Sequence, residues 1–446
     1  MKRMNLDLPE LRWKLIKKLS ASFFDKTFNA TFTGEALNNE FDSLKASKIL
    51  SALEIQAFIF EHIIRPDPDD QDQLQFFNGI SVEIERRLAG RIQVSSYQDL
   101  IQLTQRIEWQ SSTPNQLLSL EYFIMSNGLY LVALDIRRKA VDKILKDPKS
   151  SCPDIVLRRF SAAMEASQLE NAHSVLNELQ STGPISWLRN CALKDRLSLY
   201  HSILAKDTQQ RNRLFDRYYG KNDRDFAAFV KGKSIAIVGP APSETYDKQE
   251  IDQFDLVMRL NYQGRENMPD PDIYGSRIDI SYFNVNNARK MLENNNGKLA
   301  KDLQYGIFKS EKHARTASFL CPSRMAKTPE EYWLQGWPNM IQIALFDLLA
   351  FEPARIKVFK INFYLSETLH YKGYQTRHVN IDDPKFLFKG HACHHIVRQL
   401  DFIRQMVKYQ LIEVDKTCEL IIGMTDDDYL KAMEDLYVNR YYETIL

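Results

Sequence analysis

The chain has few cysteines, no long apolar run and almost no net charge. Five cysteines are scattered over 446 residues without a CxxC motif, so the sequence favours reduced thiols in a cytoplasmic protein over a disulfide framework. No apolar run approaches the about 20 residues that cross a bilayer. Lysine and arginine number 59 against 58 acidic residues, and this balance argues against a protein that coats nucleic acid through bulk charge.

Glycine-rich phosphate-binding motifs are missing as well. Segment 235–245 (IAIVGPAPSET) matches neither GxGxxG nor GxxxxGK[ST], because Pro240 and Pro242 stand where flexible glycines would be. A dinucleotide-binding fold and a P-loop NTPase are therefore disfavoured. The hydrophobic fraction of 44% is enough for substantial cores. At about 150 residues per domain, the length of the chain favours two or three domains.

The two halves of the chain carry different hydrophobic patterns. Residues 1–225 show helical periodicity almost throughout, and we expect an all-α domain there. Segments 114–146 and 153–179 are each typical of a pair of helices, and the two pairs are offset by about 40 residues, near the length of a helical repeat. A plain helical bundle explains the same pattern, so both arrangements stay open.

Residues 226–446 indicate an α/β domain. Short apolar runs alternate with helical segments, of which 339–350 is the clearest and 427–437 is the last. This alternation predicts a Rossmann-like, mainly parallel sheet. The expected strands are 231–239, 256–260, 279–283, 306–309, 318–321 and 355–361, of which the fourth and fifth are the weakest.

Residues that could bind a phosphate follow the first two expected strands. Gly239 lets a ligand approach the backbone, and Ser243 offers a hydroxyl and an N–H group. Arg259 and Asn261 stand two positions apart at a strand end, so their side chains point to the same side of the sheet. Ligands bind beyond the carboxyl ends of strands in open α/β sheets, and we predict a nucleotide site here. An ordinary strand-to-helix turn is the alternative.

Five of the nine histidines lie in one short stretch of the second half. They are His370, His378, His391, His394 and His395. Histidine is the natural general base near neutral pH, so we expect at least one of them to be catalytic. A solvated loop is an alternative. A zinc site at 390–395 is disfavoured, because ligands this close together cannot complete a tetrahedral site without a second cluster.

The nucleotide-site segments together resemble the large sialyl motif of the eukaryotic-type sialyltransferase family. The closest match lies in 250–261 (EIDQFDLVMRLN). Its matching positions are Ile251, Asp252, Asp255, Val257, Arg259 and Asn261. Downstream, 274–277 and Asn284 are similar to the family's Gly-Ser/Thr-Lys/Arg step and to its second nucleotide-binding asparagine. Pro240 departs from the family, which has an asparagine after the first glycine.

Three later segments are similar to the remaining motifs of that family. Segment 336–362 is similar to the small sialyl motif, and His370-Tyr371 to the short His-Tyr motif, motif III. Segment 394–399 is similar to the very small motif, His-x4-Glu, with Gln399 in the place of the glutamate. The resemblance covers just under half of the chain. No cysteine pair matches the family's disulfide, which fits a divergent, bacterial-type member.

The resemblance implies a glycosyltransferase with a GT-A-like variant of the Rossmann-like fold. It implies transfer of a sialic-acid-like or Kdo-like 2-keto sugar acid from its CMP donor to a glycan or glycolipid acceptor, with inversion and without a metal cofactor. His394 is then the candidate base, with His391 and His395 as register alternatives, and His370 binds the phosphate. The implied nucleotide-binding residues are Gly239, Ser243, Arg259, Asn261, Asn284, Pro338 and Asn339.

Other functions stay open from the sequence alone. The departures at Pro240 and Gln399 favour a non-catalytic helical scaffold with a degenerate nucleotide-binding module, and the clustered histidines oppose it. A transferase that uses UDP- or GDP-sugars is weakened, because the DxD-like segments 270–272 and 426–428 are typical of a turn and a helix start. We expect a cytoplasmic enzyme of surface polysaccharide synthesis. Arg12–Lys18 could touch anionic lipid at the inner membrane face or form a solvated helix face.

Overall fold

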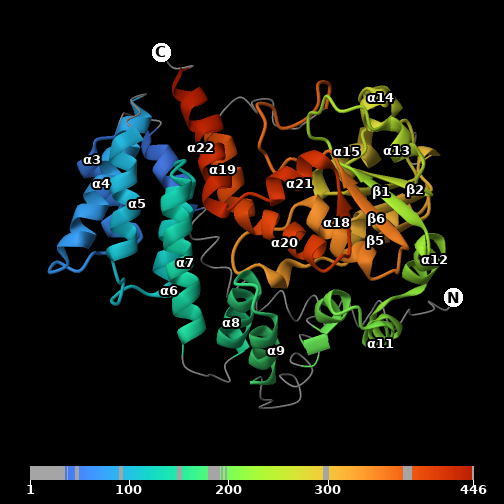
Figure 1. Ribbon diagram of the computed structural model, residues 1–446, viewed down its shortest axis with the longest axis horizontal. Helices are drawn as coiled ribbons and strands as arrows, with labels where there is room; N and C mark the ends of the chain where they lie inside the picture. Colours follow the sequence, from blue (N-terminus) through green and yellow to red (C-terminus); the bar gives the residue numbers. More distant parts are fainter. Residues whose placement is uncertain are drawn as a thin grey trace.

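The computed structural model joins a helical part to a parallel sheet (Figure 1). The residues it describes are 36–37, 39–45, 50–89, 94–147, 153–178, 191, 194–195, 198–294, 301–374 and 384–443. Arg12–Lys18 and His378 lie outside these residues. Within the described chain, no helix is both long enough and apolar enough to cross a membrane.

The described residues before the sheet form helices. These are α3 (Ala52–His62), α4 (Gln71–Leu88), α5 (Val94–Arg106), α6 (Pro114–Met125), α7 (Tyr130–Lys146), α8 (Pro153–Glu165), α9 (Leu169–Asn177), α11 (Thr208–Tyr218) and α12 (Lys221–Val230). The helical pairs expected over 114–146 and 153–179 form as α6 with α7 and α8 with α9, and each pair packs together. Whether they are repeats of a separate domain over 1–225 stays a prediction.

Local sequence explains where the α6–α7 pair begins and turns. The Thr113 hydroxyl accepts the Gln116 N–H at 3.3 Å, the Gln116 side chain in turn accepts the Thr113 N–H at 2.9 Å, and Pro114 opens the helix. At the turn, Gly128 has φ +80°, and a side chain there would also press against Phe388. The short turn therefore requires glycine, and it sets the two helices against one another.

Seven parallel strands form one sheet, which confirms the α/β class. They are β1 (Ser234–Val238), β2 (Leu256–Leu260), β3 (Ile280–Phe283), β4 (Tyr305–Phe308), β5 (Ser323–Met325), β6 (Arg355–Phe359) and β7 (Glu413–Val414). Their order is β5-β4-β3-β2-β1-β6-β7, and every pairing is parallel. The chain runs outward from β1 to β5 and then crosses back to β6, so the order reverses beside β1.

One expected strand is wrong. Residues 318–320 follow α17 (Glu311–Ala317) as a turn, and the fifth strand is β5, a few residues later. The apolar pair Phe319 and Leu320 suggested a buried strand, but Phe319 is 89% exposed. The real strand, Ser323–Met325, is too short and too polar to give a strand pattern in the sequence.

Helices cover both faces of the sheet. Ala236 and Val238 pack with Ile251 and Phe254, around α13 (Lys248–Asp252), in one cluster. Ile235 and the other inward residues of β1 join a second cluster on the opposite face. Helices α14 (Pro271–Tyr274), α15 (Val285–Asn294), α18 (Met340–Leu349), α19 (Pro384–His394), α20 (Ile396–Lys408), α21 (Lys416–Ile422) and α22 (Asp426–Glu443) complete this part.

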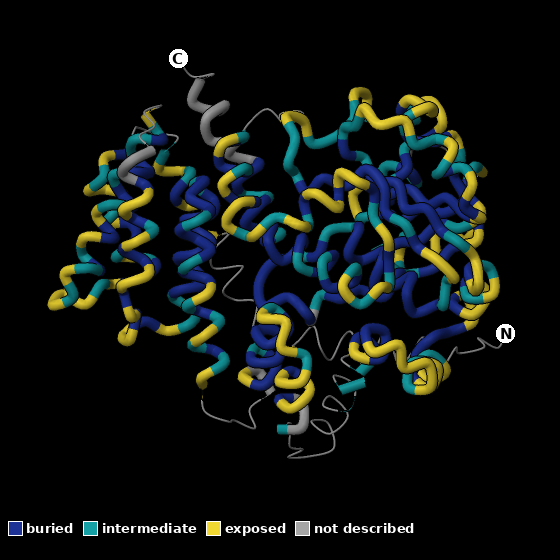
Figure 2. Tube along the Cα trace, viewed as in Figure 1, coloured by how far each residue is buried: buried dark blue, intermediate teal, exposed yellow. Residues whose placement is uncertain are grey.

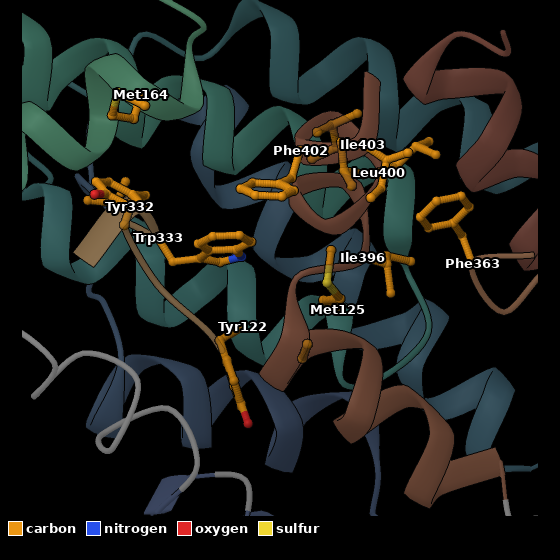
Figure 3. Packing of buried hydrophobic residues seen from close by; sticks show 14 of the residues in the cluster. Tyr122, Met125, Met164, Tyr332, Trp333, Phe363, Ile396, Leu400, Phe402 and Ile403 are labelled. Carbon is orange, nitrogen blue, oxygen red and sulfur yellow. The ribbon is translucent and has the colours of Figure 1, made fainter. Parts of the chain in front are cut away.

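The second cluster is continuous with the helical part. Its buried residues run from Leu37 to Tyr437 (Figure 2). Figure 3 shows Met164 from α8 beside Tyr332, and the Trp333 and Phe402 ring centroids lie 5.5 Å apart. Helices α19 and α22 lie between α6–α7 and the sheet (Figure 1). The two parts therefore share one hydrophobic core.

A buried cluster of charged side chains joins β5 to helices α12 and α18. Arg324 is 1% exposed at its side chain and donates to Asp223 of α12 at 2.7 Å and to Asp347 of α18 at 2.5 and 3.0 Å. The Tyr282 hydroxyl also donates to Asp347, at 2.7 Å. Asp223 also pairs with the Lys327 ammonium at 3.2 Å, so Asp347 depends more strongly on Arg324. A buried charge that loses its partner is strongly destabilising.

We expect Arg324→Met to lower the free energy of unfolding by about 3–5 kcal/mol, because two buried carboxylates lose their common partner. The measurement is urea denaturation followed by circular dichroism. Arg315→Met on α17 is the matched control, since the Arg315 side chain is 73% exposed; it should cost less than about 1 kcal/mol. Equal midpoints for the two variants would contradict this account of the cluster.

Candidate functional site

A cavity of about 390 Å³ lies at the carboxyl ends of the central strands. Its walls include Pro240 after β1, Asn261 after β2, Asn284 after β3, Lys309 after β4 and Asn362 beyond β6. Strand order reverses between β1 and β6, and such a point in an open parallel sheet is where ligands bind. The sequence pattern predicted a nucleotide site at this edge; the structure has a cavity there, and the nucleotide as its ligand stays a prediction.

The beginning of α18 forms another wall of the cavity. Residues 338–343 line it. Asn339 is the N-cap residue, but its side chain donates to the Tyr364 hydroxyl at 2.8 Å and does not cap the helix. The positive end of the α18 dipole thus borders the cavity, which favours an anionic ligand.

Gln399 joins three parts of this wall. Its Oε1 accepts the Asn339 N–H at 2.9 Å, and its Nε2 donates to the Trp337 carbonyl at 3.0 Å and to the His394 carbonyl. Gln399 itself is 1% exposed, so it holds these segments from behind the cavity.

The structure brings six of the sequence-predicted residues into this one cavity. They are Asn261, Asn284, Pro338, Asn339, His370 and His394. They come from five separate places in the chain, and the Asn284 N–H donates to the Asn261 side-chain oxygen at 2.9 Å. The motif segments therefore converge in space.

Gly239 and Arg259 lie beside this cavity and line a small neighbouring one. A side chain at Gly239 would collide with the Lys360 carbonyl and with Ile361, so glycine here lets β1 and the end of β6 approach closely. Arg259 is buried, and its guanidinium donates to the carbonyls of Tyr274 at 2.8 Å, Gly275 at 2.9 Å and Arg277 at 3.0 Å. Burial lowers the pKa of Arg259 to about 10. Its geometry is that of a residue that holds the 274–277 turn.

Ser243 does not line the cavity. Its hydroxyl accepts from the Lys360 ammonium at 2.9 Å, and Lys360 also donates to the Thr245 carbonyl at 2.8 Å and to Asp247 at 2.5 Å. The Lys360 side chain is 1% exposed. The loop after β1 is thus fastened to the end of β6, and the Ser243 hydroxyl contributes to that contact.

His391 and His395 are buried behind the cavity. His391 Nδ1 lies 2.7 Å from the hydroxyl of Tyr130 in α7, and His395 Nε2 lies 3.8 Å from Glu121 in α6. Burial lowers the pKa of each histidine to about 3. Both therefore face the helical part as neutral side chains, and His394 alone of the adjacent three lines the cavity.

His394 has the orientation of a base. Its Nδ1 lies 2.9 Å from the Trp337 carbonyl, which can only accept, so Nδ1 carries the proton and Nε2 holds the lone pair. Burial lowers the pKa of His394, the positive charge of Lys309 adds to this effect, and the bond to Trp337 opposes it. The imidazole is therefore neutral at pH 7 and able to accept a proton.

His370 lies near the β2 end of the cavity. Its ring stacks on Tyr374 with centroids 4.3 Å apart, and Tyr374 is hydrogen-bonded to the Asn261 side chain. Burial lowers the pKa of His370 to about 4, and its Nδ1 is buried without a hydrogen-bond partner among the described residues. Such a nitrogen is costly to leave unpaired, and a bound ligand can supply its partner.

Several cavity residues escaped the sequence analysis. Lys309, Trp337 and Asn362 are the clearest. Lys309 and Asn362 each stand directly after an expected strand or within two residues of its observed end, so the signal that identified Asn261 could have found them. Trp337 gave no such signal, because its position depends on the fold around Gln399.

The cavity lining bears no carboxylate among the described residues. No group of three or more metal-ligating side chains occurs in the described part of the chain. Asp270 instead caps α14, accepting the Asp272 N–H at 2.9 Å, and Asp426 pairs with Arg404 at 2.5 Å. The donors at the cavity thus suit an anion better than a divalent cation, and the metal independence of any reaction stays a prediction.

We expect Tyr130→Phe to lower the free energy of unfolding by about 1–3 kcal/mol, because the buried His391 Nδ1 loses its partner. Urea denaturation at pH 7 measures it. Tyr246→Phe is the control, since Tyr246 is 77% exposed, and it should change the value by less than about 0.5 kcal/mol. An unaltered midpoint for Tyr130→Phe would contradict the role of this bond.

The site therefore combines a cavity suited to an anion, a neutral histidine that can accept a proton and a second histidine whose Nδ1 has no partner among the described residues. These features come from the geometry of this chain alone. Neither the comparison with protein-family models nor the comparison with curated proteins gives a match.

Proposed function

We propose that the chain is a glycosyltransferase that moves a sialic-acid-like or Kdo-like 2-keto sugar acid from its CMP donor to a glycan acceptor. The observation that carries this proposal is the convergence of Asn261, Asn284, His370 and His394 on one cavity at the carboxyl edge of the sheet. Asn261 and Asn284 belong to the segments that resemble the large sialyl motif, His370 to the one that resembles motif III and His394 to the one that resembles the very small motif. Positions from three sialyl-like motifs thus line one cavity, as a shared ligand requires.

The nucleotide is proposed to lie across the ends of β1, β2 and β3. Asn261 and Asn284 would hydrogen-bond the ribose or phosphate, while the beginning of α18 and His370 would face the negative charge. Since His370 has a pKa of about 4, it is neutral at pH 7 and binds a phosphate oxygen through its N–H. A nearby phosphate would raise that pKa.

The proposed reaction is a single displacement at the anomeric carbon. His394 Nε2 takes the proton of the acceptor hydroxyl, whose oxygen forms a bond to that carbon. The bond from the carbon to the phosphate oxygen breaks, and CMP leaves with the electron pair. His370 and the α18 dipole stabilise the charge that develops on the phosphate. Attack opposite the leaving group inverts the configuration.

Three further expectations depend on the same proposal. A GT-A-like fold variant, surface polysaccharide as product and peripheral contact with the inner membrane face belong to it as expectations. The buried contacts of His391 and His395 with α6 and α7 support one role for the helical part, which is to brace α19 and α20 behind the cavity.

Nucleotide selectivity tests the site. We expect CMP and CDP to raise the melting temperature, and UMP, UDP and GDP to do so little, with the same result in EDTA. A ligand at 100 times its Kd adds about 2.7 kcal/mol to the free energy of unfolding, a shift that differential scanning fluorimetry resolves. No shift with any nucleotide would instead favour the scaffold alternative.

The pH dependence tests the base. A general base works only when deprotonated, so kcat/KM falls as the pH drops below its pKa. Because the pKa of His394 is lowered, we expect the acid limb of the kcat/KM profile to lie below pH 6.5, the ordinary histidine value. His394→Asn keeps a donor to the Trp337 carbonyl but has no base, and kcat should fall by about 10²- to 10⁴-fold.

The control for this change is His62→Asn in α3, which lies outside the cavity lining and should leave kcat unchanged. Full activity of His394→Asn with CMP-sialic acid or CMP-Kdo as donor would rule out His394 as the base.

A further inference from the structure

The charge in the cavity comes from one side chain. Of the described residues that line the cavity, Lys309 is the one with a permanent charge, and none is acidic. Lys309 follows β4, on the side of the cavity away from β1. Neighbouring strands lie about 4.8 Å apart, so the end of β4 is about 10 Å from the end of β2. His370 and Lys309 thus mark two separate positions along the cavity.

The Lys309 ammonium is held in place. It lies 3.0 Å from Glu330 and over the ring of Trp337 at 5.5 Å from the centroid. The Lys309 side chain is 25% exposed and that of Glu330 17%, so the pair is neither fully solvated nor sealed in the core. The Lys309 ammonium can therefore bind an anion in the cavity. It would then donate hydrogen bonds both to that anion and to the Glu330 carboxylate.

Lys309 and His394 flank the same residue. Trp337 offers its ring to the Lys309 ammonium, and its carbonyl orients His394. The charge of Lys309 also acts on His394, since it helps to lower the pKa of that histidine. The cation and the candidate base are therefore close to one another at the β4 side of the cavity.

We propose that Lys309 binds the carboxylate of the transferred sugar acid and so selects acidic donors over neutral ones. This inference rests on the proposed function. In a 2-keto sugar acid the carboxylate is attached to the anomeric carbon, the carbon that the acceptor attacks. The group that binds the carboxylate and the base that activates the acceptor must therefore lie near one another, and Lys309 and His394 both contact Trp337.

The arrangement also orients the donor. With the phosphate near His370 and the ends of β2 and β3, the sugar continues toward β4, where Lys309 meets its carboxylate. Trp337 contacts both Lys309 and His394 and also lines the cavity. A neutral sugar has no carboxylate to pair with the Lys309 ammonium. The protein should therefore bind an acidic donor more tightly than a neutral one.

The test compares CMP with CMP-sialic acid and CMP-Kdo by isothermal titration calorimetry on the full chain. For Lys309→Met we expect the Kd of the sugar donor to rise about tenfold or more, the loss expected for one charged hydrogen bond, while the Kd of CMP stays within about twofold. Lys309→Arg should restore most of the donor affinity. Lys312→Met, an exposed lysine of α17, is the matched control and should bind both ligands like the wild type.

A change in the ligand tests the same contact without any variant. The methyl ester of the donor carboxylate should bind the wild-type protein about tenfold more weakly than the free acid, and Lys309→Met should not distinguish ester from acid. Equal losses of CMP and donor affinity in Lys309→Met would assign Lys309 to the phosphate and overturn the inference. Unchanged donor affinity would leave Lys309 a structural partner of Glu330. Failure of the wild-type protein to bind CMP would overturn the proposed function itself.

Discussion

The geometry of the cavity depends on the hydrogen bonds of Gln399. This residue joins the Trp337–Asn339 connection to α19 and α20, although Asn339 and Gln399 are 60 positions apart in the chain. It accepts from one N–H and donates to two carbonyls. A glutamate here would present only acceptors to the carbonyls of Trp337 and His394 at neutral pH. An amide at position 399 therefore satisfies all three contacts in this geometry.

The helical part supports this arrangement from behind. Helix α19 contacts α6 and α22, and Tyr130 and Glu121 face the two buried histidines next to His394. Tyr97 and the Leu131 N–H both donate to Glu434 of α22, at 2.5 and 3.1 Å, and burial raises the pKa of Glu434 to about 7. These hydrogen bonds thus join helix α22 to the helical part. The position of His394 therefore depends on contacts of α19, α20 and α22 with α6 and α7.

The pattern of apolar residues predicted most of the strands of the sheet. The polar residues directly after those strands predicted the edge of the sheet at which the cavity lies. The apolar runs at 234–238 and 256–260 are buried strands, as short runs of branched residues indicate. Segment 355–359 is a strand that buries Ile356, Val358 and Phe359. The pair Phe319-Leu320 misled because apolar residues can also lie exposed in a turn. Polar residues directly after strands, such as Asn261 and Asn284, could be predicted because parallel strands end at one edge.

The sequence could not predict the contacts at the site between residues that are far apart in the chain. Ser243 bonds to Lys360, 117 positions away, and His391 bonds to Tyr130, 261 positions away. Neither partner is visible from local pattern, so both residues looked like candidates for ligand contact. Only the fold decides which of His391, His394 and His395 lines the cavity. The positive φ of His395, +47°, turns the chain between α19 and α20 and leaves His394 on the cavity side.

The central claim is that a cytidine nucleotide occupies the cavity at the carboxyl edge of the sheet. A crystal structure with CMP tests it most directly. The account predicts density for CMP between the ends of β1–β3 and α18, with a phosphate oxygen within about 3.2 Å of a His370 nitrogen. An ordered CMP at any other place, or an empty cavity at a CMP concentration that saturates binding in solution, would contradict it.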